Sequence, residues 1–301
     1  MATTTTITTN YDGKVAGSIF VESYNEIDAI KNGAITVIPN AKFKIHLRKV
    51  QTTNGKVNYT CGFAPVGSIT LTENTITLKH IKNDFEICKD DFRQTWDEEL
   101  TPEMEDAIIA SVLGELGEEL AVEIWSGAVA TTGIVGGLIP QFTADATVIK
   151  ANNGIVPAGA AITKSNVVAE LEKIENAIPT ALRKKSDLVW SVSSNVATAY
   201  GQYMVAQGLN YGFGGNGFDL KYGKYTLKED SGLPDNTIVV ARKSNLVLAT
   251  NKMSDMNEIK LVDTSETLLD GNIRGKFAYL AATGYYEGAE IVWYLSTTTP
   301  D

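Results

Sequence analysis

The chain has 301 residues, of which 44% are hydrophobic and 21% are charged, and this composition supports a buried core of ordinary size. The formal net charge of −10 argues against a nucleic-acid reader that gains its affinity by neutralising phosphates, but it is compatible with a container for nucleic acid. No apolar run approaches the roughly 18–20 residues of a membrane span, and the first residues show no signal-peptide pattern, so we expect no membrane partner and synthesis in a cytoplasm.

Residues 1–35 show little of the apolar periodicity of a core. Their threonine-rich start and the turn-forming residues 10–13 predict an extended or flexible arm, with a short helical turn at residues 27–30. An arm of this kind is either a disordered tail or a segment that becomes ordered against a neighbouring copy. The residues alone do not decide between the two.

Residues 36–72 are predicted to form a β ribbon. Apolar and basic side chains alternate between residues 43 and 48, as in a half-buried strand. Asn54 and Gly55 predict a hairpin turn, and residues 57–61 are expected to return as the partner strand. A two-stranded ribbon is only marginally stable alone, so we expect it to lie on another surface.

Three short strand patterns between residues 68 and 88 lead to a long helix, which is predicted over residues 101–125. A threonine and a proline at its start suit the N-cap and the first helical position. Gly114 and Gly117 destabilise a helix interior, and they predict close approach by another backbone. The face expected to be buried consists of Ile109, Leu113, Leu116, Leu120 and Ile124.

The rest of the chain alternates helix and strand. Residues 127–160 are rich in glycine and are predicted to be a loop with a short strand near residues 146–150. The alternation that follows predicts a mixed sheet flanked by helices, and the C-terminal part returns to strands. The expected helices run from residue 163 or 165 to 178 and from 194 to 207, and the expected strands cover residues 188–192, 224–227, 237–241, 258–262, 273–281 and 289–295.

The sequence offers no pattern of catalytic or ligand-binding chemistry. The glycines of residues 211–217 lack the Gly-Lys-Ser/Thr of a phosphate-binding loop and are predicted to be a plain loop. Glu115, Glu118 and Glu119 resemble paired carboxylates, but a solvated helix face explains them better. Two histidines and two cysteines supply neither a zinc cluster nor a base for a nucleophile. We therefore expect no enzyme activity, no catalytic residue, no cofactor and no metal.

Two oppositely charged segments are candidates for contact between copies of the chain. Basic side chains on the outward side of the first ribbon strand form either a solvated edge or a docking face for an acidic neighbour. Acidic residues before and within the long helix are the possible partner on an adjacent copy. The candidate contact residues are Lys44, Arg48, Lys49, Lys56, Glu98, Glu99 and Glu103.

The order of these segments resembles the major capsid proteins of tailed bacteriophages, which share the Hong Kong 97-type fold. The resemblance is carried by residues 75–90, 101–127, 188–193, 232–240 and 272–294. It implies an α+β fold with an N-terminal arm, an extended β-hairpin loop, a peripheral domain with a long spine helix, and an axial α/β domain. The implied boundaries are 1–35 for the arm, 36–72 for the hairpin loop, 73–161 and 251–301 for the peripheral domain, and 162–250 for the axial domain.

The resemblance also implies a structural function. Members of this family assemble into the icosahedral head shell, which encloses double-stranded DNA without reading its sequence. The implied partners are further copies in hexamers and pentamers, a portal protein, a separate scaffold protein and a decoration protein, and the implied location is the virion after assembly in the host cytoplasm. Some members cross-link a hairpin lysine to a neighbour's asparagine; Lys49 and Lys56 are hairpin lysines here, but no partner asparagine can be assigned.

Three other functions compete with the capsid. Encapsulin-type nanocompartment proteins share the fold, but they open with an amphipathic helix, a pattern that residues 1–20 do not show. A phage tail or baseplate protein is disfavoured by the long helix and the α/β segment. An unrecognised α/β enzyme has no candidate site in this sequence.

Overall fold

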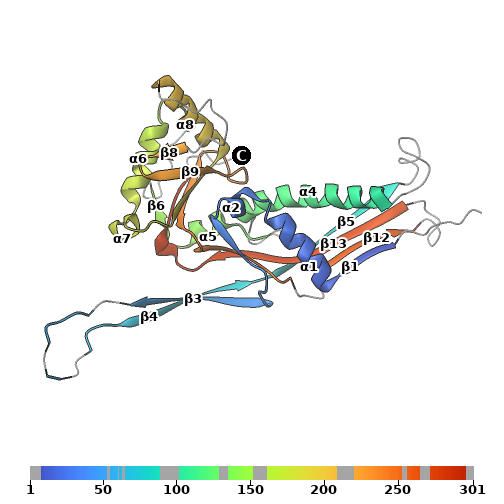
Figure 1. Cartoon of the computed structure of the whole chain (residues 1–301), viewed down its shortest axis with the longest axis horizontal. Coiled ribbons are helices and arrows are strands. Elements are labelled where there is room, and N and C mark those ends of the chain that lie inside the picture. Colours follow the sequence, from blue (N-terminus) through green and yellow to red (C-terminus); the bar gives the residue numbers. More distant parts are fainter. Residues whose placement is uncertain are drawn as a thin grey trace, which may run out of the picture.

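The computed structural model describes residues 8–52, 55–59, 61–62, 65–88, 102–128, 135–151, 161–208, 220–252, 256–264 and 272–295. These residues form two six-stranded sheets and a separate two-stranded ribbon. The molecule is elongated: a long helix lies along the first sheet, a lobe with several helices covers the second sheet, and the ribbon projects from the body (Figure 1).

The first sheet joins segments from both ends of the chain. Its strand order is β1-β12-β13-β11-β2, and β5 also pairs with β13. The long strand β13 is antiparallel to β12, β11 and β5, so it is the centre of the sheet, whereas β2 runs parallel to β11. The strands are β1 (Thr8–Asp12), β2 (Ile35–Ile38), β5 (Lys79–Cys88), β11 (Leu246–Thr250), β12 (Glu258–Asp263) and β13 (Asn272–Tyr285).

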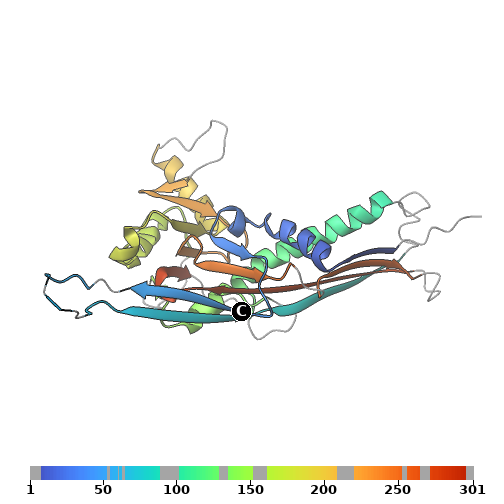
Figure 2. The same cartoon turned by 60° about the horizontal axis from the view of Figure 1, so that its bottom comes forward.

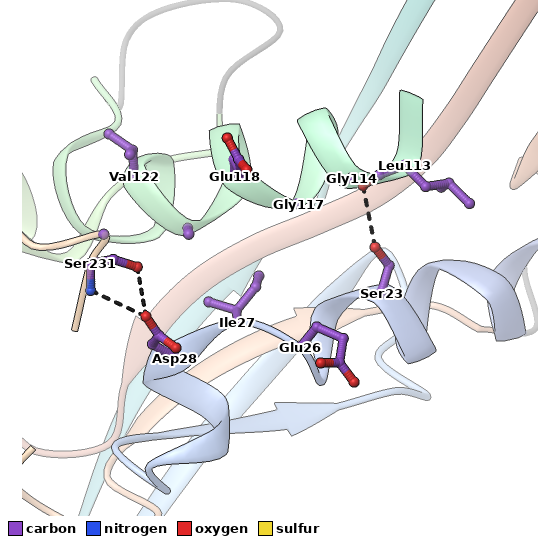
Figure 3. Close-up of a pocket in the computed structure, with 12 residues that line it drawn as sticks. Ser23, Glu26, Ile27, Asp28, Leu113, Gly114, Gly117, Glu118, Val122 and Ser231 are labelled. Carbon is purple, nitrogen blue, oxygen red and sulfur yellow. Dashed lines mark hydrogen bonds between the residues drawn. The ribbon is translucent and has the colours of Figure 1, made fainter. Parts of the chain in front are cut away.

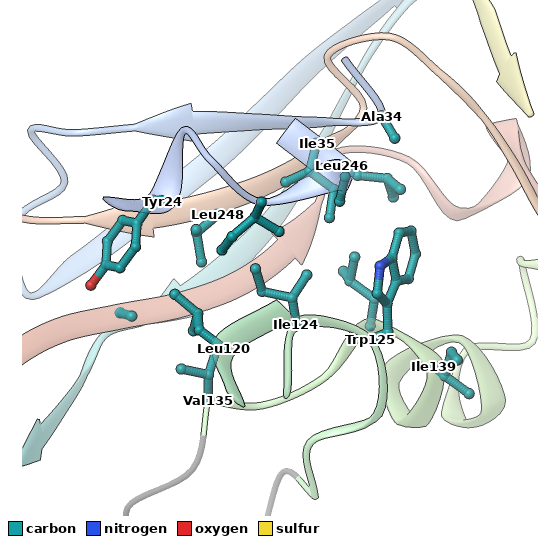
Figure 4. Packing of buried hydrophobic residues seen from close by; sticks show 14 of the residues in the cluster. Tyr24, Ala34, Ile35, Leu120, Ile124, Trp125, Val135, Ile139, Leu246 and Leu248 are labelled. Carbon is teal, nitrogen blue, oxygen red and sulfur yellow. The ribbon is translucent and has the colours of Figure 1, made fainter. Parts of the chain in front are cut away.

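The long helix is α4 (Pro102–Ser126), which confirms the helix predicted over residues 101–125. Its predicted apolar face packs against the core together with Trp125, and Figure 4 shows Leu120, Ile124 and Trp125 in that packing. The glycine prediction is wrong among the described residues. A Cβ at Gly114 would have no atom within 4 Å, and one at Gly117 would meet only Ser23 Oγ, at 3.7 Å.

The second sheet separates two hydrophobic cores. Its strand order is β6-β14-β10-β7-β9-β8. In β10, Ile238 and Val240 face a core shared with helices α6 and α8, whereas Val239 and Ala241 face the core shared with α4 and the first sheet. A strand that is apolar on both faces needs a layer on each side, as observed here. The elements are β6 (Ile149–Lys150), α6 (Val167–Ala177), α7 (Thr180–Arg183), β7 (Leu188–Val192), α8 (Ser194–Ala206), β8 (Leu220–Tyr222), β9 (Tyr225–Glu229), β10 (Thr237–Arg242), the 3-10 helix η1 (Gly288–Glu290) and β14 (Ile291–Leu295).

Residues 13–24 differ from the predicted arm, whereas the short helical turn predicted at residues 27–30 is confirmed by the helix α2 (Asp28–Lys31). Residues 13–24 form the helix α1 (Gly13–Tyr24). Ala16, Phe20 and Tyr24 are buried in the main core, and the rings of Phe20 and Tyr24 lie 5.3 and 6.3 Å from that of Tyr279. The four-residue spacing of these three side chains is that of a helix face. The prediction of an extended arm is therefore wrong for α1. Residues 1–20 were expected to show no amphipathic helix; among them, residues 8–12 form β1, whereas residues 13–20 lie in a helix with one buried face.

The sheet pairing of two strands does not follow the domain boundaries that the family resemblance implies. β11 falls in the range expected for the axial domain, but it pairs with β13 in the first sheet. β14 falls in the range expected for the peripheral domain, but it pairs with β10 in the second sheet. Because β14 is apolar on both faces, it is suited to the interior of a sheet that is covered on both sides.

Helix α5 (Leu138–Ala144) lies where a loop was predicted. Leu138 and Phe142 are buried in the main core, and the ring of Phe142 lies 5.6 Å from that of Tyr285. Pro140 falls in the first turn, where proline costs no helical hydrogen bond. Tertiary packing therefore decides the conformation of a segment whose composition favours a loop.

Candidate assembly surfaces

A ribbon of two strands, β3 (Lys44–Thr52) and β4 (Ile69–Thr77), extends away from both sheets (Figures 1 and 2). The strands are antiparallel, and their register runs from Lys44 opposite Thr77 to Thr52 opposite Ile69. The predicted partner strand at residues 57–61 is therefore wrong, because residues 57–59 lie in the connection. Pairing with β4 provides hydrogen-bond partners for more backbone N–H and C=O groups than pairing with the short predicted strand at residues 57–61 would.

The inner face of the ribbon is attached to the body by an apolar cluster. Leu47 and Ile76 are 2% and 5% exposed. They pack with residues of β11 and β13 on the side of the first sheet opposite α4. A Cβ at Gly284 would overlap the side chain of Ile76, so β13 needs a glycine where the ribbon crosses it.

Polar contacts continue this attachment further along the ribbon. Lys49 Nζ lies 2.8 Å from Glu290 Oε2, and both side chains are mostly buried. The amide of Gln51 donates a hydrogen bond of 2.7 Å to Glu287 Oε2. The inner face is thus held by the turn between β13 and β14 as well as by the apolar cluster.

The outer face carries exposed apolar side chains. Val50, Ile69 and Leu71 are 58%, 72% and 69% exposed, and we call these three residues the outer patch. Val50 is paired directly with Leu71, and Thr52 with Ile69, so the three side chains share one face. A contiguous group of large apolar side chains on a projecting surface marks an interaction site. The connection between the strands adds Val57, Tyr59 and Val66, which are also exposed.

The charged residues of the outer face lie closer to the body. Glu73 Oε1 lies 2.6 Å from His46 Nδ1, and Glu73 Oε2 accepts a hydrogen bond of 2.9 Å from Arg48 Nε. The hydrogen bond from Arg48 is the main reason why the pKa of Glu73 lies below its ordinary value. The outer face therefore changes from charged at its base to apolar toward its tip.

The predicted contact residues fall into three groups. Lys49 and Arg48 are engaged within the chain, by Glu290 and Glu73. Lys44 and Lys56 are exposed. Glu98 and Glu99 lie outside the described residues, and Glu103 lies in the first turns of α4, where side chains are not described. Contact between copies through these residues stays a prediction.

A groove runs between α4 and the segment that joins α1 to α2 (Figure 3). Its volume is about 530 Å³, and Gly114 and Gly117 form part of its wall. Glu26, Asp28 and Glu118 also line it. Because neither glycine carries a side chain, this part of the groove wall is formed by the backbone of α4.

The junction between α4 and the second sheet contains a carboxyl group that the sequence analysis missed. Asp230 is fully buried and accepts hydrogen bonds from Trp125 Nε1 at 3.0 Å and from the backbone N–H of Gly232 at 3.1 Å. Burial, with a smaller contribution from the nearby charge of Asp28, raises the pKa of Asp230 to about 6. The sequence carries no local signal that pairs Asp230 with Trp125, because these residues are far apart in the chain.

Within the part of the chain that the structure describes, no helix is both long and apolar enough to cross a membrane. The same residues contain no group of three or more His, Cys, Asp or Glu side chains that could hold a metal ion.

No protein-family model and no curated protein matches the sequence. Solved structures do match. A chain of the satellite phage P4 procapsid, in a structure that includes the size determination (Sid) protein, is 12% identical with a TM-score of 0.60, and the match covers 93% of this chain and 98% of that chain. A capsid chain of a native GTA particle is 12% identical with a TM-score of 0.61, covering 89% of each chain. A capsid chain of the cyanophage P-SCSP1u is 13% identical with a TM-score of 0.53, covering 88% of this chain and 87% of that chain. The chain therefore has the Hong Kong 97-type capsid fold, and the predicted α+β fold of this type is confirmed, whereas the division into arm and domains stays a prediction.

Proposed function

We propose that the chain is the major capsid protein of a tailed bacteriophage, which assembles into the icosahedral head shell that encloses double-stranded DNA. The observation that carries the proposal is the outer patch, a group of large apolar side chains on a projecting ribbon. Apolar side chains gain free energy on leaving water, and further copies of the chain supply the covering surface many times in a closed shell. The capsid fold supports the same conclusion.

The proposal makes the chain a structural protein rather than an enzyme. Its main partners are further copies of itself in hexamers and pentamers. A portal protein, a separate scaffold protein and a decoration protein are the further partners that we propose. The location is the virion, after assembly in the host cytoplasm. The net charge of −10 suits a wall that encloses DNA without holding it tightly across its surface.

Negative-stain microscopy and sedimentation of the purified full chain test this proposal. We expect the unaltered chain to form capsomers or closed shells. A variant with Val50→Thr, Ile69→Thr and Leu71→Thr keeps β-forming residues but removes the outer patch, and it should remain monomeric with unchanged circular dichroism. The control carries Val15→Thr and Val205→Thr, whose side chains are 55% and 57% exposed outside the ribbon. Assembly by the patch variant, or a strictly monomeric unaltered chain at high concentration, would refute the proposal.

An encapsulin-type nanocompartment is the second candidate, and helix α1 is the observation that favours it. Encapsulin-type proteins open with an amphipathic helix, a pattern not expected in residues 1–20, but α1 covers residues 13–24 and buries Ala16, Phe20 and Tyr24. The contents of particles isolated from the natural source separate the two candidates. Double-stranded DNA that is protected from nuclease supports the phage head, whereas enclosed folded protein supports the nanocompartment.

A further inference from the structure

Basic side chains surround a pocket in the lobe formed by the second sheet. The pocket has a volume of about 440 Å³ and is lined by Arg183, Lys184, Lys185, Lys224 and Lys228. No aspartate or glutamate is among the described residues that line it. A concavity with charges of one sign concentrates the electrostatic field and attracts ions of the opposite sign. In a chain whose net charge is −10, this local excess of positive charge needs a separate explanation.

Two of the five cations are fixed in place by the fold. The guanidinium of Arg183 donates hydrogen bonds to the carbonyl oxygens of Glu175 at 2.6 Å and Ile178 at 2.9 Å, at the end of α6. Lys224 Nζ donates to the carbonyl oxygen of Arg183 at 2.8 Å and lies 5.0 Å from the ring centroid of Tyr225. None of these partners is a carboxylate, so both positive charges are held at the pocket without being neutralised.

The next two cations are exposed. Lys184 and Lys185 follow α7, and neither ammonium group has an ion pair with a described residue. The nearest acid in the sequence, Asp187, is occupied elsewhere, because Arg242 binds it through Nε at 3.0 Å and NH2 at 2.8 Å. This contact with Arg242 lowers the pKa of Asp187. The carboxylate of Asp187 is therefore bound mainly by Arg242, although the charge of Lys185 also acts on it.

We propose that this pocket binds a phosphate-bearing anion, either the backbone of a nucleic acid or a free polyphosphate. Lysine binds phosphate as a point charge, and Ser186 and Thr226 add neutral hydrogen-bond donors to the lining. Several cations within one concavity suit an anion that carries several charges within a few ångströms. Carboxylates spaced along an acidic peptide fit this arrangement less well. The site goes beyond the proposed shell function, and it is tested on the unassembled chain.

The test measures binding of two probes to the full chain at low salt. The first probe is a short fluorescent DNA duplex, followed by anisotropy, and the second is inorganic tripolyphosphate, followed by calorimetry and by competition with the duplex. The pocket variant carries Lys184→Gln and Lys185→Gln. The matched control carries Lys14→Gln and Lys164→Gln, which removes the same charge from exposed lysines outside the pocket. Circular dichroism of each variant verifies folding.

We expect the pocket variant to bind the duplex more weakly by on the order of tenfold and the control to bind like the unaltered chain. A plot of the logarithm of the duplex binding constant against the logarithm of the salt concentration has a negative slope. The magnitude of this slope should decrease by about one for each lysine removed. Binding of both probes identifies a phosphodiester site, and binding of tripolyphosphate alone identifies a free polyphosphate site. Absence of binding to either probe, or an equal loss in both variants, overturns the proposal. Protection of Lys184 and Lys185 from acetylation only after self-association also overturns it, in favour of an acidic segment of a second copy.

Discussion

The indole N–H of Trp125 donates a hydrogen bond of 3.0 Å to Asp230, and this contact joins the end of helix α4 to the turn after β9. The other carboxylate oxygen of Asp230 accepts from the backbone N–H of Gly232. The charge that acts on Asp230 is that of another acid, Asp28, which accepts a hydrogen bond of 2.6 Å from Ser231 Oγ. Burial makes ionisation of Asp230 unfavourable in the folded state, and the two uncharged hydrogen-bond donors offset this effect only in part.

This junction makes the free energy of unfolding depend on pH. Burial raises the pKa of Asp230 from 3.8 to about 6, so the folded state holds the proton more tightly than the unfolded state. The resulting stabilisation is complete below the unfolded pKa and is lost as the pH rises through the folded pKa. About two pKa units correspond to at most ~3 kcal/mol.

The variant Asp230→Asn lacks this titration. The free energy of unfolding of the unaltered chain, minus that of the variant, should therefore increase as the pH is lowered from neutral toward the unfolded pKa. Urea denaturation at a series of pH values measures both quantities. Parallel pH profiles for the two proteins would show that Asp230 titrates normally.

At the same junction, the backbone of Gly232 packs directly against the backbone of α4. A Cβ at this position would overlap the carbonyl group of Ala121 in α4. Gly232→Ala should therefore destabilise the fold by about 2–3 kcal/mol, because neither backbone can move without disturbing the core. The matched control is Gly114→Ala, where the Cβ meets no atom within 4 Å. Since alanine favours a helix interior, the control should stabilise by up to about 1 kcal/mol. Denaturant unfolding with equal stabilities for the two variants would contradict this assignment.

Local sequence patterns correctly predicted the elements whose buried side chains are apolar residues at helical spacing or consecutive apolar residues. The helix α4 follows from its i, i+4 apolar stripe, and β7 follows from consecutive apolar residues. The helix α1 was missed because its buried face consists of Ala16, Phe20 and Tyr24, which form a weak stripe after a threonine-rich start. Its buried face packs against Phe277 and Tyr279, which are remote in the sequence.

The ribbon was predicted in position but not in register. Asn54 and Gly55 favour a local turn, whereas the observed partner strand is β4, in which Ile76 packs against β13 at Gly284. The same limitation affected the site. Lys49 was grouped with the outward basic residues, but period-two alternation places it on the face of Leu47, where Glu290 is its partner. Contacts between segments that are remote in the sequence thus determine the register of the ribbon and the partner of Lys49, which local patterns could not predict.

Charge reversal at Lys44 tests the predicted docking face. Lys44 is exposed on the outer face, and Arg48 is already paired with Glu73 within the ribbon. Lys44→Glu should therefore block assembly without lowering the stability of the monomer, and adding Arg48→Glu should strengthen the effect. Sedimentation velocity measures assembly, and Lys14→Glu provides a control with the same change of charge. Normal assembly by the double variant would leave the basic residues as a solvated edge.

The ion pair between Lys49 and Glu290 should hold the ribbon to the body in the monomer. Its side chains are 22% and 19% exposed, and Glu290 also lies 3.2 Å from Arg242. Lys49→Glu places two carboxylates together, which should cost about 1–3 kcal/mol at a partly buried site and increase hydrogen exchange in β3 and β4. Exchanging the two residues by Lys49→Glu with Glu290→Lys should restore part of this protection. The rescue is incomplete because Arg242 then faces a cation, although it keeps its contact with Asp187. If Lys49 acts only between copies, Lys49→Glu will leave hydrogen exchange of the dilute monomer unchanged.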